Sequence, residues 1–572
     1  MKRKSIMALC MAFAISLTTL IGCKKDNDTK QPVESSQPSQ NGETKSEDKP
    51  LVSPENPITI TVFIGDSTIP AATPDNKIYK KIKEELGITF EIELLAGDIN
   101  QKLGVMIAGD DLPDLVTYNS KFQDANTLIP LEDLIQKYAP DIYSHYEPHW
   151  EKMKDQNDQH IYCMPNWGVY HGKYTANYYG GPAFWIQKDV LAQAGYPKVT
   201  TLDQYFDLIE DYMKKNPTID GQPTIGFETL AVAGSSFVLE NAPAQLAGSP
   251  NDGGVIVKDG VAELYADKEI SKTYFKKLNE MYNKGVLDRE AITQNKDQYL
   301  QKIASGRVLG MYDQGWHFQS AEETLLKDKR YERTYAPLAL TYEGIKPYYR
   351  DRSVVNLGNG FAITKNCEEP ERVIYALNLL MSEKWQKLLN WGVEGEDYSI
   401  DAATGQPVWS DEQEVNNNDN AYKAANRAAA IYSYMPKIEG QYSDGNATAI
   451  NDNPIQFEKS LNEYDRNFFK QYGVVSRAGM MGDAPENPVH YPAWNINIPA
   501  NSPASIANTQ LEDARLKWLP RVIASNTSDF EAQWNAFVEE FNNCNPKAYL
   551  DAINEGIQYR IKNWTPTTNN SK

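Results

Sequence analysis

The stretch that decides the fold begins with ITITVFI at residues 58–64 and continues with ITFEIEL at residues 88–94. Both runs are rich in β-branched residues, and the second alternates apolar and polar side chains, which is typical of strands. The expected order is strand, helix, strand, helix, strand, with strands over 58–64, 88–94 and 115–118 and helices over 75–86 and 99–108. This βαβαβ order favours a parallel or mixed α/β sheet.

Ligands of such sheets bind beyond the carboxyl ends of the strands. Two loops fall at that edge, at residues 65–67 and 119–121, and they carry Asp66 and Asn119. Either side chain could exchange hydrogen bonds with a polar ligand such as a sugar hydroxyl, and capping of a turn explains them equally well.

The rest of the chain is mostly helical, with short strands. A strand at 308–312 leads into Asp313-Gln314-Gly315-Trp316, and another is expected at 361–364. Helices are expected over residues 202–215, 268–283, 298–305, 370–381, 421–432, 455–472, 505–519, 530–541 and 546–561. A chain of 572 residues exceeds what one hydrophobic core usually holds, which favours two large lobes.

The N-terminus has the pattern of a secretory signal. Basic residues at 2–4 precede an apolar run over 6–20, and the run ends in the sequence LIGC. This ending resembles the lipobox of bacterial lipoproteins, which implies that residues 1–22 are removed and that Cys23 is lipidated. Two or three acyl chains hold a protein firmly on a membrane. We therefore expect a lipid-anchored protein at the extracellular face of a bacterial cell membrane; a plain secreted protein is the alternative.

The segment that follows Cys23 contains almost no apolar residues. Such a segment cannot bury enough surface to offset its chain entropy, so we expect residues 23–50 to form a disordered tether. No other run approaches the length of about 18–20 apolar residues that a membrane span requires.

The charge balance narrows the range of partners. The chain has 57 Lys and Arg against 77 Asp and Glu, a net charge of −20, and loss of the signal changes this to −23 (54 minus 77). Nucleic acid is excluded as a partner because it requires a basic face. An anionic ligand such as an oligouronide is mildly disfavoured, although one local basic pocket would reverse that expectation.

Aromatic residues and thiols give a second compositional signal. The chain has 34 Tyr and 11 Trp but only 17 Phe. Excess Tyr and Trp suit surfaces that are apolar on one side and wet on the other, as sugar faces require, although a protein can also use Tyr generally. Beyond Cys23, the mature chain holds Cys163, Cys367 and Cys544, which lack paired spacing and are expected to be free thiols.

The sequence lacks the common signatures of enzymes and metal sites: it contains no GxSxG, GxxxxGK[ST], HExxH or Rossmann glycine run. His145 and His149 are four residues apart, but Pro148 would break the helix that zinc binding would need, so we expect a structural role. The pairs Glu394 with Glu396 and Glu539 with Glu540 resemble glycosidase carboxylates only in type, because carboxylates so close in sequence seldom face one scissile bond.

Several motifs occur in a distinctive order: DLPD at 111–114, FWIQKD at 184–189, LAQAG at 191–195, PKVTTLD at 197–203, ASGRVLGM at 304–311, GFAIT at 360–364 and WGVEG at 391–395 before Tyr398. With these motifs and its lipobox, the mature chain resembles the extracellular solute-binding proteins of bacterial ABC importers (family 1), in the group of LplA-, YtcQ- and LipO-like sugar-binding lipoproteins.

The resemblance implies a two-lobed periplasmic-binding-protein-like α/β fold (type II) with a helix-rich second lobe and a ligand between the lobes. The first lobe would hold residues 51–125 and 360–395, and the second would hold 126–359 and 396–572. Some relatives carry a calcium loop in the second lobe. Here the matching residues, 216–223, offer only Asp220 as a good oxygen ligand, so we expect no calcium at that loop.

The expected ligand site combines ring platforms with a few polar anchors. Trp316 is the first candidate, because it follows a strand end at the place where relatives put a stacking Trp; ordinary packing is the alternative. The other candidates, each with a structural alternative, are Trp167, Tyr170, Tyr178, Tyr179, Asp66, Asn119 and Glu394, followed by Asp313, Glu240, Arg350 and Trp494.

These features favour a monomeric binding component that captures an oligosaccharide and delivers it to ABC permease subunits, without a cofactor or metal and without enzymatic activity. Three alternatives remain open: a peptide-binding importer component, a surface glycoside hydrolase and a polysaccharide-binding lipoprotein without a transporter.

Overall fold

The computed structural model describes residues 50–172, 177–250, 253–350, 355–482 and 493–564. The expected signal peptide, Cys23 and the tether up to residue 49 lie outside these residues. Contacts separate residues 1–49 from a unit that spans Pro50–Lys572, and this unit is described below. Within the described ranges, no helix has the length and apolar character that crossing a membrane demands.

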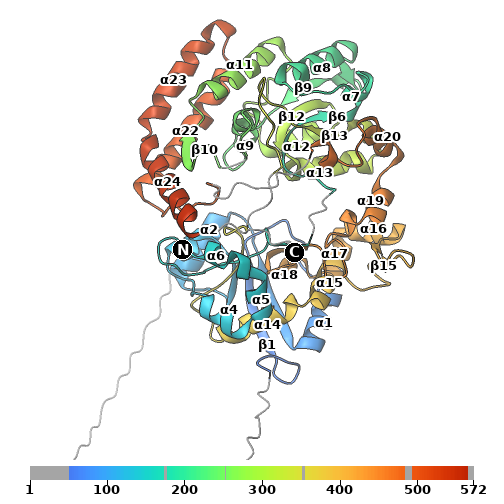
Figure 1. Ribbon diagram of the computed structural model, residues 1–572, viewed down its shortest axis with the longest axis vertical. Helices are drawn as coiled ribbons and strands as arrows, with labels where there is room; N and C mark the ends of the chain where they lie inside the picture. The colour runs from blue at the N-terminus through green and yellow to red at the C-terminus, as the bar shows by residue number, and fades with distance from the viewer. Residues whose placement is uncertain (1–49, 173–176, 251–252, 351–354, 483–492, 565–572) are drawn as a thin grey trace, which may run out of the picture. The chain divides into compact units, whose positions relative to one another are not determined.

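The first sheet contains the predicted βαβαβ segment (Figure 1). Its strand order is β2 (Ile88–Leu94), β1 (Ile58–Ile64), β3 (Leu115–Thr117), β14 (Gly360–Ile363) and β4 (Met164–Pro165). β1 runs parallel to β2 and β3, whereas β14 runs antiparallel to β3 and β4. The mixed sheet and all three expected strands are confirmed.

Local signals explain the first helices, α1 (Lys77–Leu86) and α2 (Ile99–Gly109). The Asn76 side chain caps α1 by accepting from the main-chain N–H groups of Ile78 and Tyr79, each at 3.0 Å. Gly87 ends α1 with φ of 74°, a conformation that favours glycine, and a Cβ there would lie 2.1 Å from a main-chain oxygen.

The second sheet has the strand order β13 (Tyr335–Leu338), β6 (Pro182–Gln187), β12 (Val308–Gln314) and β9 (Ile225–Glu228). β6 and β12 are buried along their whole length, as central strands covered on both faces should be. β12 extends two residues beyond the expected strand, because Asp313 and Gln314 continue its antiparallel pairing with β6. The expected helices α8 (Leu202–Lys215), α11 (Glu269–Lys284) and α12 (Lys296–Ala304) are present.

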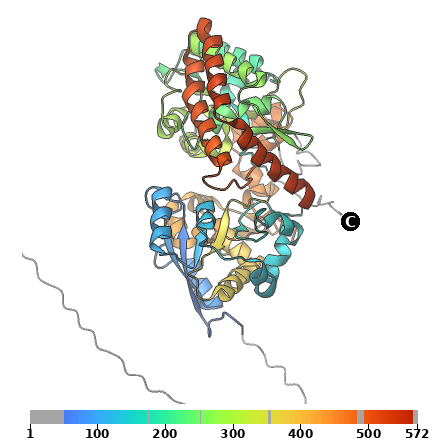
Figure 2. The same ribbon diagram turned by 90° about the vertical axis from the view of Figure 1, so that its left-hand side faces the viewer.

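Three long helices close the chain: α22 (Pro503–Ala524), α23 (Phe530–Asn543) and α24 (Pro546–Asn563). α22 packs against α11, α23 and α24, and Figure 2 shows α22 and α23 side by side. The expected helix at 505–519 runs five residues further, through Pro520.

Two predicted tail helices are each broken in two. Residues 421–432 form α17 (Asn420–Asn426) and α18 (Ala429–Tyr434), because Arg427 is extended and its guanidinium is held in a buried ion pair. Residues 455–472 form α19 (Pro454–Ser460) and α20 (Glu463–Gln471), because Asn462 has an extended backbone and its side chain caps α20 by accepting from the main-chain N–H of Asp465. Both breaks depend on side-chain contacts that cannot be inferred from the spacing of apolar residues along a helix.

Two large hydrophobic clusters lie in this unit, one around each sheet. The cluster around the first sheet also takes side chains from residues 131–169 and 428–435, because α4 (Glu132–Tyr138) and α5 (Pro140–Tyr146) pack on α14 (Pro370–Met381). The cluster around the second sheet takes α20 and the three closing helices. These cores divide the chain differently from the boundaries expected from the sequence, which had placed 131–169 and 428–435 in the second lobe.

Candidate functional site

A ring platform lies at the start of α13 (Gly315–Lys327), directly after β12. Trp316 is 57% exposed, an unusual state for so large an apolar side chain. Its indole is tilted by 37° over the ring of Phe237, with centroids 5.6 Å apart. A ring that is exposed on one face and supported on the other can receive the apolar face of a ligand.

Buried polar contacts hold this platform in place. Asp313 is fully buried, and its carboxylate accepts from the Tyr299 hydroxyl at 2.7 Å and lies 2.9 Å from Nδ1 of His317. The other ring nitrogen of His317 lies 3.3 Å from the hydroxyl of Ser235. Burial outweighs these contacts and raises the pKa of Asp313. Asp313 therefore fixes the turn that carries Trp316 and has no exposed surface for a ligand.

Tyr178 joins the ring platform from a neighbouring segment. The carbonyls of Gly180 and Gly181 accept from the main-chain N–H groups of Trp316 and Gly315, both at 3.2 Å. Tyr178 is 51% exposed, and its hydroxyl lies 3.5 Å from Oε1 of Gln319 on α13. We call Trp316, Phe237 and Tyr178 the ring platform.

The adjacent Tyr179 has a different environment. It is buried in the core of the second sheet, and its hydroxyl lies 2.7 Å from the carbonyl of Pro182 and 2.9 Å from that of Tyr349. These contacts give Tyr179 a packing role, so the two neighbouring tyrosines separate into one that is exposed and one that is structural.

Asp66 and Asn119 lie at the carboxyl ends of β1 and β3, as the sequence predicts. Asp66 is half-buried, and it accepts from Thr68 and, at 3.0 Å, from the hydroxyl of Tyr434. Asn119 caps the short helix α3 (Ser120–Asp124) through the main-chain N–H of Lys121. Both side chains therefore have capping contacts, and Asn119 also lines a cavity that is described below.

A second pair of rings is formed by Trp167 and Trp494, whose centroids are 5.8 Å apart at a tilt of 48°. Both are half-buried. The Trp167 loop is held by the carboxylate of Glu439, which accepts from the main-chain N–H groups of Gly168 and Val169. Burial raises the pKa of Glu439 to about 6. No pattern in the sequence indicates that Glu439 holds this loop, because the two are about 270 residues apart in the chain.

Tyr170 lies in this same loop region. It is half-buried in β5 (Tyr170–His171), which pairs in parallel with β17 (Glu439–Gly440).

Nδ1 of His145 lies 2.9 Å from Nε2 of His171, so the imidazoles pair with each other. Among the described residues, no group of three or more His, Cys, Asp or Glu side chains has the geometry of a metal site.

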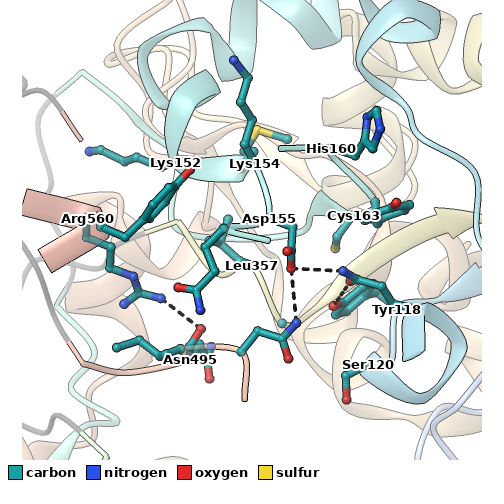
Figure 3. Close-up of a pocket in the computed structure, with 18 of the residues that line it drawn as sticks. Tyr118, Ser120, Lys152, Lys154, Asp155, His160, Cys163, Leu357, Asn495 and Arg560 are labelled. Atoms are coloured by element: carbon teal, nitrogen blue, oxygen red, sulfur yellow. Dashed lines mark hydrogen bonds between the residues drawn. The ribbon is translucent and has the colours of Figure 1, made fainter. Parts of the chain in front are cut away.

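A cavity of about 340 Å³ lies beside the end of β3 (Figure 3). It joins segments of the first core to the chain around Asn495 and to α24. Arg560 of α24 donates to the carbonyls of Trp494 and Asn495, at 2.9 and 3.0 Å. The lining also includes Lys152, Lys154, Asp155, His160 and Trp564.

The three remaining candidates have different surroundings. Glu394 is exposed in a turn, and Arg350 donates to the carbonyls of Ala478 and Gly482. Glu240 lies on α9 (Phe237–Glu240), the short helix that carries Phe237 of the ring platform, but its carboxylate pairs with Arg515 at 2.8 Å. None of the three is in the cavity lining.

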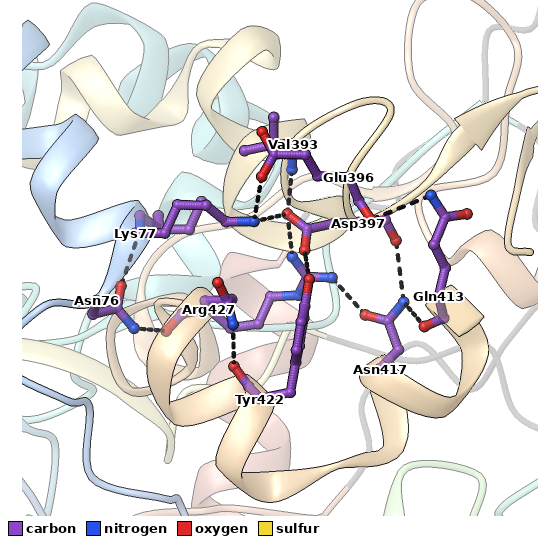
Figure 4. Close-up of polar contacts among 11 residues, drawn as sticks. Asn76, Lys77, Val393, Glu396, Asp397, Gln413, Asn417, Tyr422 and Arg427 are labelled. Atoms are coloured by element: carbon purple, nitrogen blue, oxygen red, sulfur yellow. Dashed lines mark hydrogen bonds and ion pairs between the residues drawn. The ribbon is translucent and has the colours of Figure 1, made fainter.

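Asp397, two residues after the WGVEG segment, is the centre of a buried polar network for which the sequence carries no signal (Figure 4). Its carboxylate is fully buried, pairs with Lys77 and Arg427 at 2.8 and 2.9 Å, and accepts from the Tyr422 hydroxyl at 2.6 Å. Burial opposes the charge, but the hydrogen bonds from Lys77 and Tyr422 outweigh it and hold the pKa of Asp397 below its usual range. Asp397 thus joins α1 to the segment at 393–427.

The loop that matches the calcium loop of some relatives forms a short hairpin, β7 (Thr218–Ile219) and β8 (Gln222–Pro223). The carboxylate of Asp220, at its turn, pairs with Arg330 at 2.5 Å. The absence of calcium at this loop stays a prediction.

Comparison with known proteins identifies the class. Residues 77–387 match the family described as bacterial extracellular solute-binding protein, and the chain belongs to this family. It is 26% identical over 258 residues to the fructooligosaccharide ABC transporter substrate-binding protein FusA of Streptococcus pneumoniae serotype 4 (strain ATCC BAA-334 / TIGR4). That alignment covers 43% of this chain and 47% of FusA, so the chain spans about half the length of this curated relative.

Solved structures confirm the fold. An HMO-binding, ABC-transporter-associated solute-binding protein from Bifidobacterium longum infantis ATCC 15697 superposes with a TM-score of 0.63 and 15% identity, over 88% of this chain and 99% of that one. FusA of S. pneumoniae in complex with kestose gives 0.61 and 16% identity, over 88% and 100%. The periplasmic-binding-protein-like fold is therefore established, and the family is one of binding proteins rather than enzymes.

Proposed function

We propose that this protein is the lipid-anchored binding component of an ABC importer, which takes an oligosaccharide between two lobes and delivers it to permease subunits. Membership of the solute-binding family and the FusA relationship support this function. The observation that carries the choice of ligand is Trp316, an exposed indole supported by Phe237 and held by buried polar contacts.

The two lobes in this proposal follow the two hydrophobic cores. The first contains the first sheet with residues 131–169 and 428–435, and the second contains the second sheet and the closing helices. Trp316 and Tyr178 belong to the second lobe, whereas Asp66 and Asn119 belong to the first. A ligand that contacts both sets favours the closed arrangement by the contacts that it makes only there.

The proposed anchor rests on the N-terminal sequence alone. Residues 1–22 would be removed as a signal peptide, and Cys23 would carry the lipid. Mass spectrometry of the membrane-bound protein should then find an N-terminal fragment that begins at Cys23 and carries acyl chains. An N-terminal fragment with an unmodified Cys23 would contradict the anchor.

Calorimetry of the protein without residues 1–23 tests the ligand class, since the described fold starts at residue 50. The panel should hold neutral and acidic oligosaccharides of two to six sugars together with peptides of similar length. We expect heat with at least one oligosaccharide and none with peptides. Heat with peptides alone would reject the proposed ligand.

A further inference from the structure

The cavity beside β3 carries an excess of positive charge inside an acidic protein. Its lining holds Lys152, Lys154 and Arg560 against one carboxylate, Asp155, whereas the whole chain has a net charge of −20. Local charge of the opposite sign to the whole protein attracts a ligand that the rest of the surface repels.

The one carboxylate of the lining is already occupied. Oδ2 of Asp155 accepts from the amides of Gln123 and Asn497, at 3.0 and 3.2 Å, and Oδ1 accepts from the main-chain N–H of Asn157 at 2.8 Å. Figure 3 marks two hydrogen bonds that end on the carboxylate of Asp155. Asp155 therefore has few lone pairs left for the ammonium of Lys152, and its single negative charge leaves the lining with three cations against one anion.

The two lysines of the lining differ in their partners. Lys154 pairs with Glu151 at 2.7 Å. Lys152 has no hydrogen-bond or ion-pair partner within the parts of the chain that the structure describes, and it is half-buried. An ammonium group removed from water without a partner is costly, and burial lowers the pKa of Lys152 accordingly. An anion in the cavity would supply the missing partner.

A second donor in the lining lacks an acceptor. Nε1 of Trp564 is buried, and no acceptor lies within hydrogen-bond distance among the described residues. The guanidinium of Arg560 stacks on the same indole, 4.6 Å from its centroid, and its donation to two carbonyls fixes the wall at residues 494–495. A buried N–H group without an acceptor is rare in folded proteins and indicates a position that a ligand or water oxygen occupies.

The other ionisable groups of the lining do not cancel this preference. Burial raises the pKa values of Tyr118, Tyr162 and Cys163, so these side chains are neutral near pH 7. His160 is engaged by Glu132, whose carboxylate lies 2.5 Å from its Nδ1. The ammonium of Lys152 and the indole N–H of Trp564 are two donors of the lining that have no acceptor among the described residues.

We propose that this cavity receives the acidic group of a glycan, a carboxylate or a sulfate ester, and that Lys152 selects for it. The inference rests on the proposed function, because it assigns an acidic class to the oligosaccharide. Charged oxygens accept stronger hydrogen bonds than hydroxyls do, so the preference over a neutral sugar follows from Lys152.

The test compares matched glycans on matched variants. Tetragalacturonate and its fully methyl-esterified form share one backbone, as do chondroitin tetrasaccharides with and without sulfate, and calorimetry gives the dissociation constant for each. We expect tighter binding of the more acidic member of at least one pair, with an affinity that falls as sodium chloride is raised. Lys152→Met should weaken that binding by about tenfold or more, whereas Lys214→Met, the control, should change it by less than about twofold, because Lys214 is an exposed lysine on α8 outside the cavity lining.

Each remaining outcome decides between the two proposals. Binding of neutral glycans with equal or higher affinity, unchanged in Lys152→Met, overturns the acidic class and leaves the importer function standing. Binding of inorganic sulfate or phosphate as tightly as any glycan assigns the cavity to a free ion and also overturns the inference. Binding of no glycan at all rejects both. Thermal unfolding of the two Met variants verifies that they are folded.

Discussion

Replacement of Trp316 by Ala should remove much of the ligand affinity without unfolding the protein. With 57% of the side chain exposed and roughly 250 Å² for a whole Trp side chain, about 140 Å² is available to a ligand. One sugar face covering half of this area buries about 70 Å², which is worth about 1.8 kcal/mol at about 25 cal/mol per Å². The dissociation constant should therefore rise by about twentyfold.

Calorimetry with the strongest-binding glycan of the panel measures this change. Trp316→Phe keeps a smaller ring over Phe237 and should lose only part of the affinity. Val415→Ala is the matched control, because Val415 is 69% exposed on α16 (Asp411–Asn418), outside the ring platform. If Trp316→Ala binds within twofold of the wild type while its midpoint of thermal unfolding is unchanged, the ring platform does not hold the ligand.

Three further predictions concern single side chains. Tyr178→Ala should weaken glycan binding severalfold. Tyr179→Phe should leave binding unchanged and cost about 1 kcal/mol of stability in urea unfolding, because the Tyr179 hydroxyl, unlike that of Tyr178, donates to main-chain carbonyls in the core. The reverse pattern would refute the assignment of Tyr178 as the exposed binding ring. Asp397→Asn should cost about 3–5 kcal/mol in the same assay, since it leaves the buried Arg427 without its carboxylate and leaves Lys77 with only the exposed Glu396. A loss under about 1 kcal/mol would contradict the network. Burial raises the pKa of Glu228 to about 8, so the folded protein holds a proton that the unfolded chain releases above about pH 4.3. As the pH rises from about 4.3 to about 8, the free energy of unfolding should therefore fall by on the order of 4–5 kcal/mol. Glu228→Gln, which resembles the neutral acid, should abolish most of this decline, and an equally steep decline in the variant would locate the titration elsewhere.

Much of the fold could be predicted because local patterns specify it. The strands at 58–64 and 88–94 are rich in β-branched residues and largely alternate apolar with polar side chains, and the helix between them has a capping Asn and a terminal Gly. The breaks near Arg427 and Asn462 could not be predicted, because they depend on a buried ion pair and on a cap that competes with helix continuation. Periodicity records which face of a segment is apolar, and it does not record where a distant charge will bind.

The candidate site likewise contains residues that the sequence could indicate and residues that it could not. Trp316 and Tyr178 could be singled out because glycines lie beside or near each of them at the end of an element. Both rings are exposed, and their binding role stays a proposal. Tyr179 has the same sequence context, yet its side chain turns into the core. Lys152 had no signal of its own in the sequence, because its significance depends on a cavity wall contributed by residues some 400 positions away.

The central claim is that two lobes close on an oligosaccharide, and small-angle X-ray scattering tests it most directly. Scattering should be measured on the protein without residues 1–49, with and without a saturating amount of the best-binding glycan. Closure predicts a smaller radius of gyration in the saturated sample and no change with a sugar that gives no heat. An unchanged radius of gyration at saturation would contradict the account.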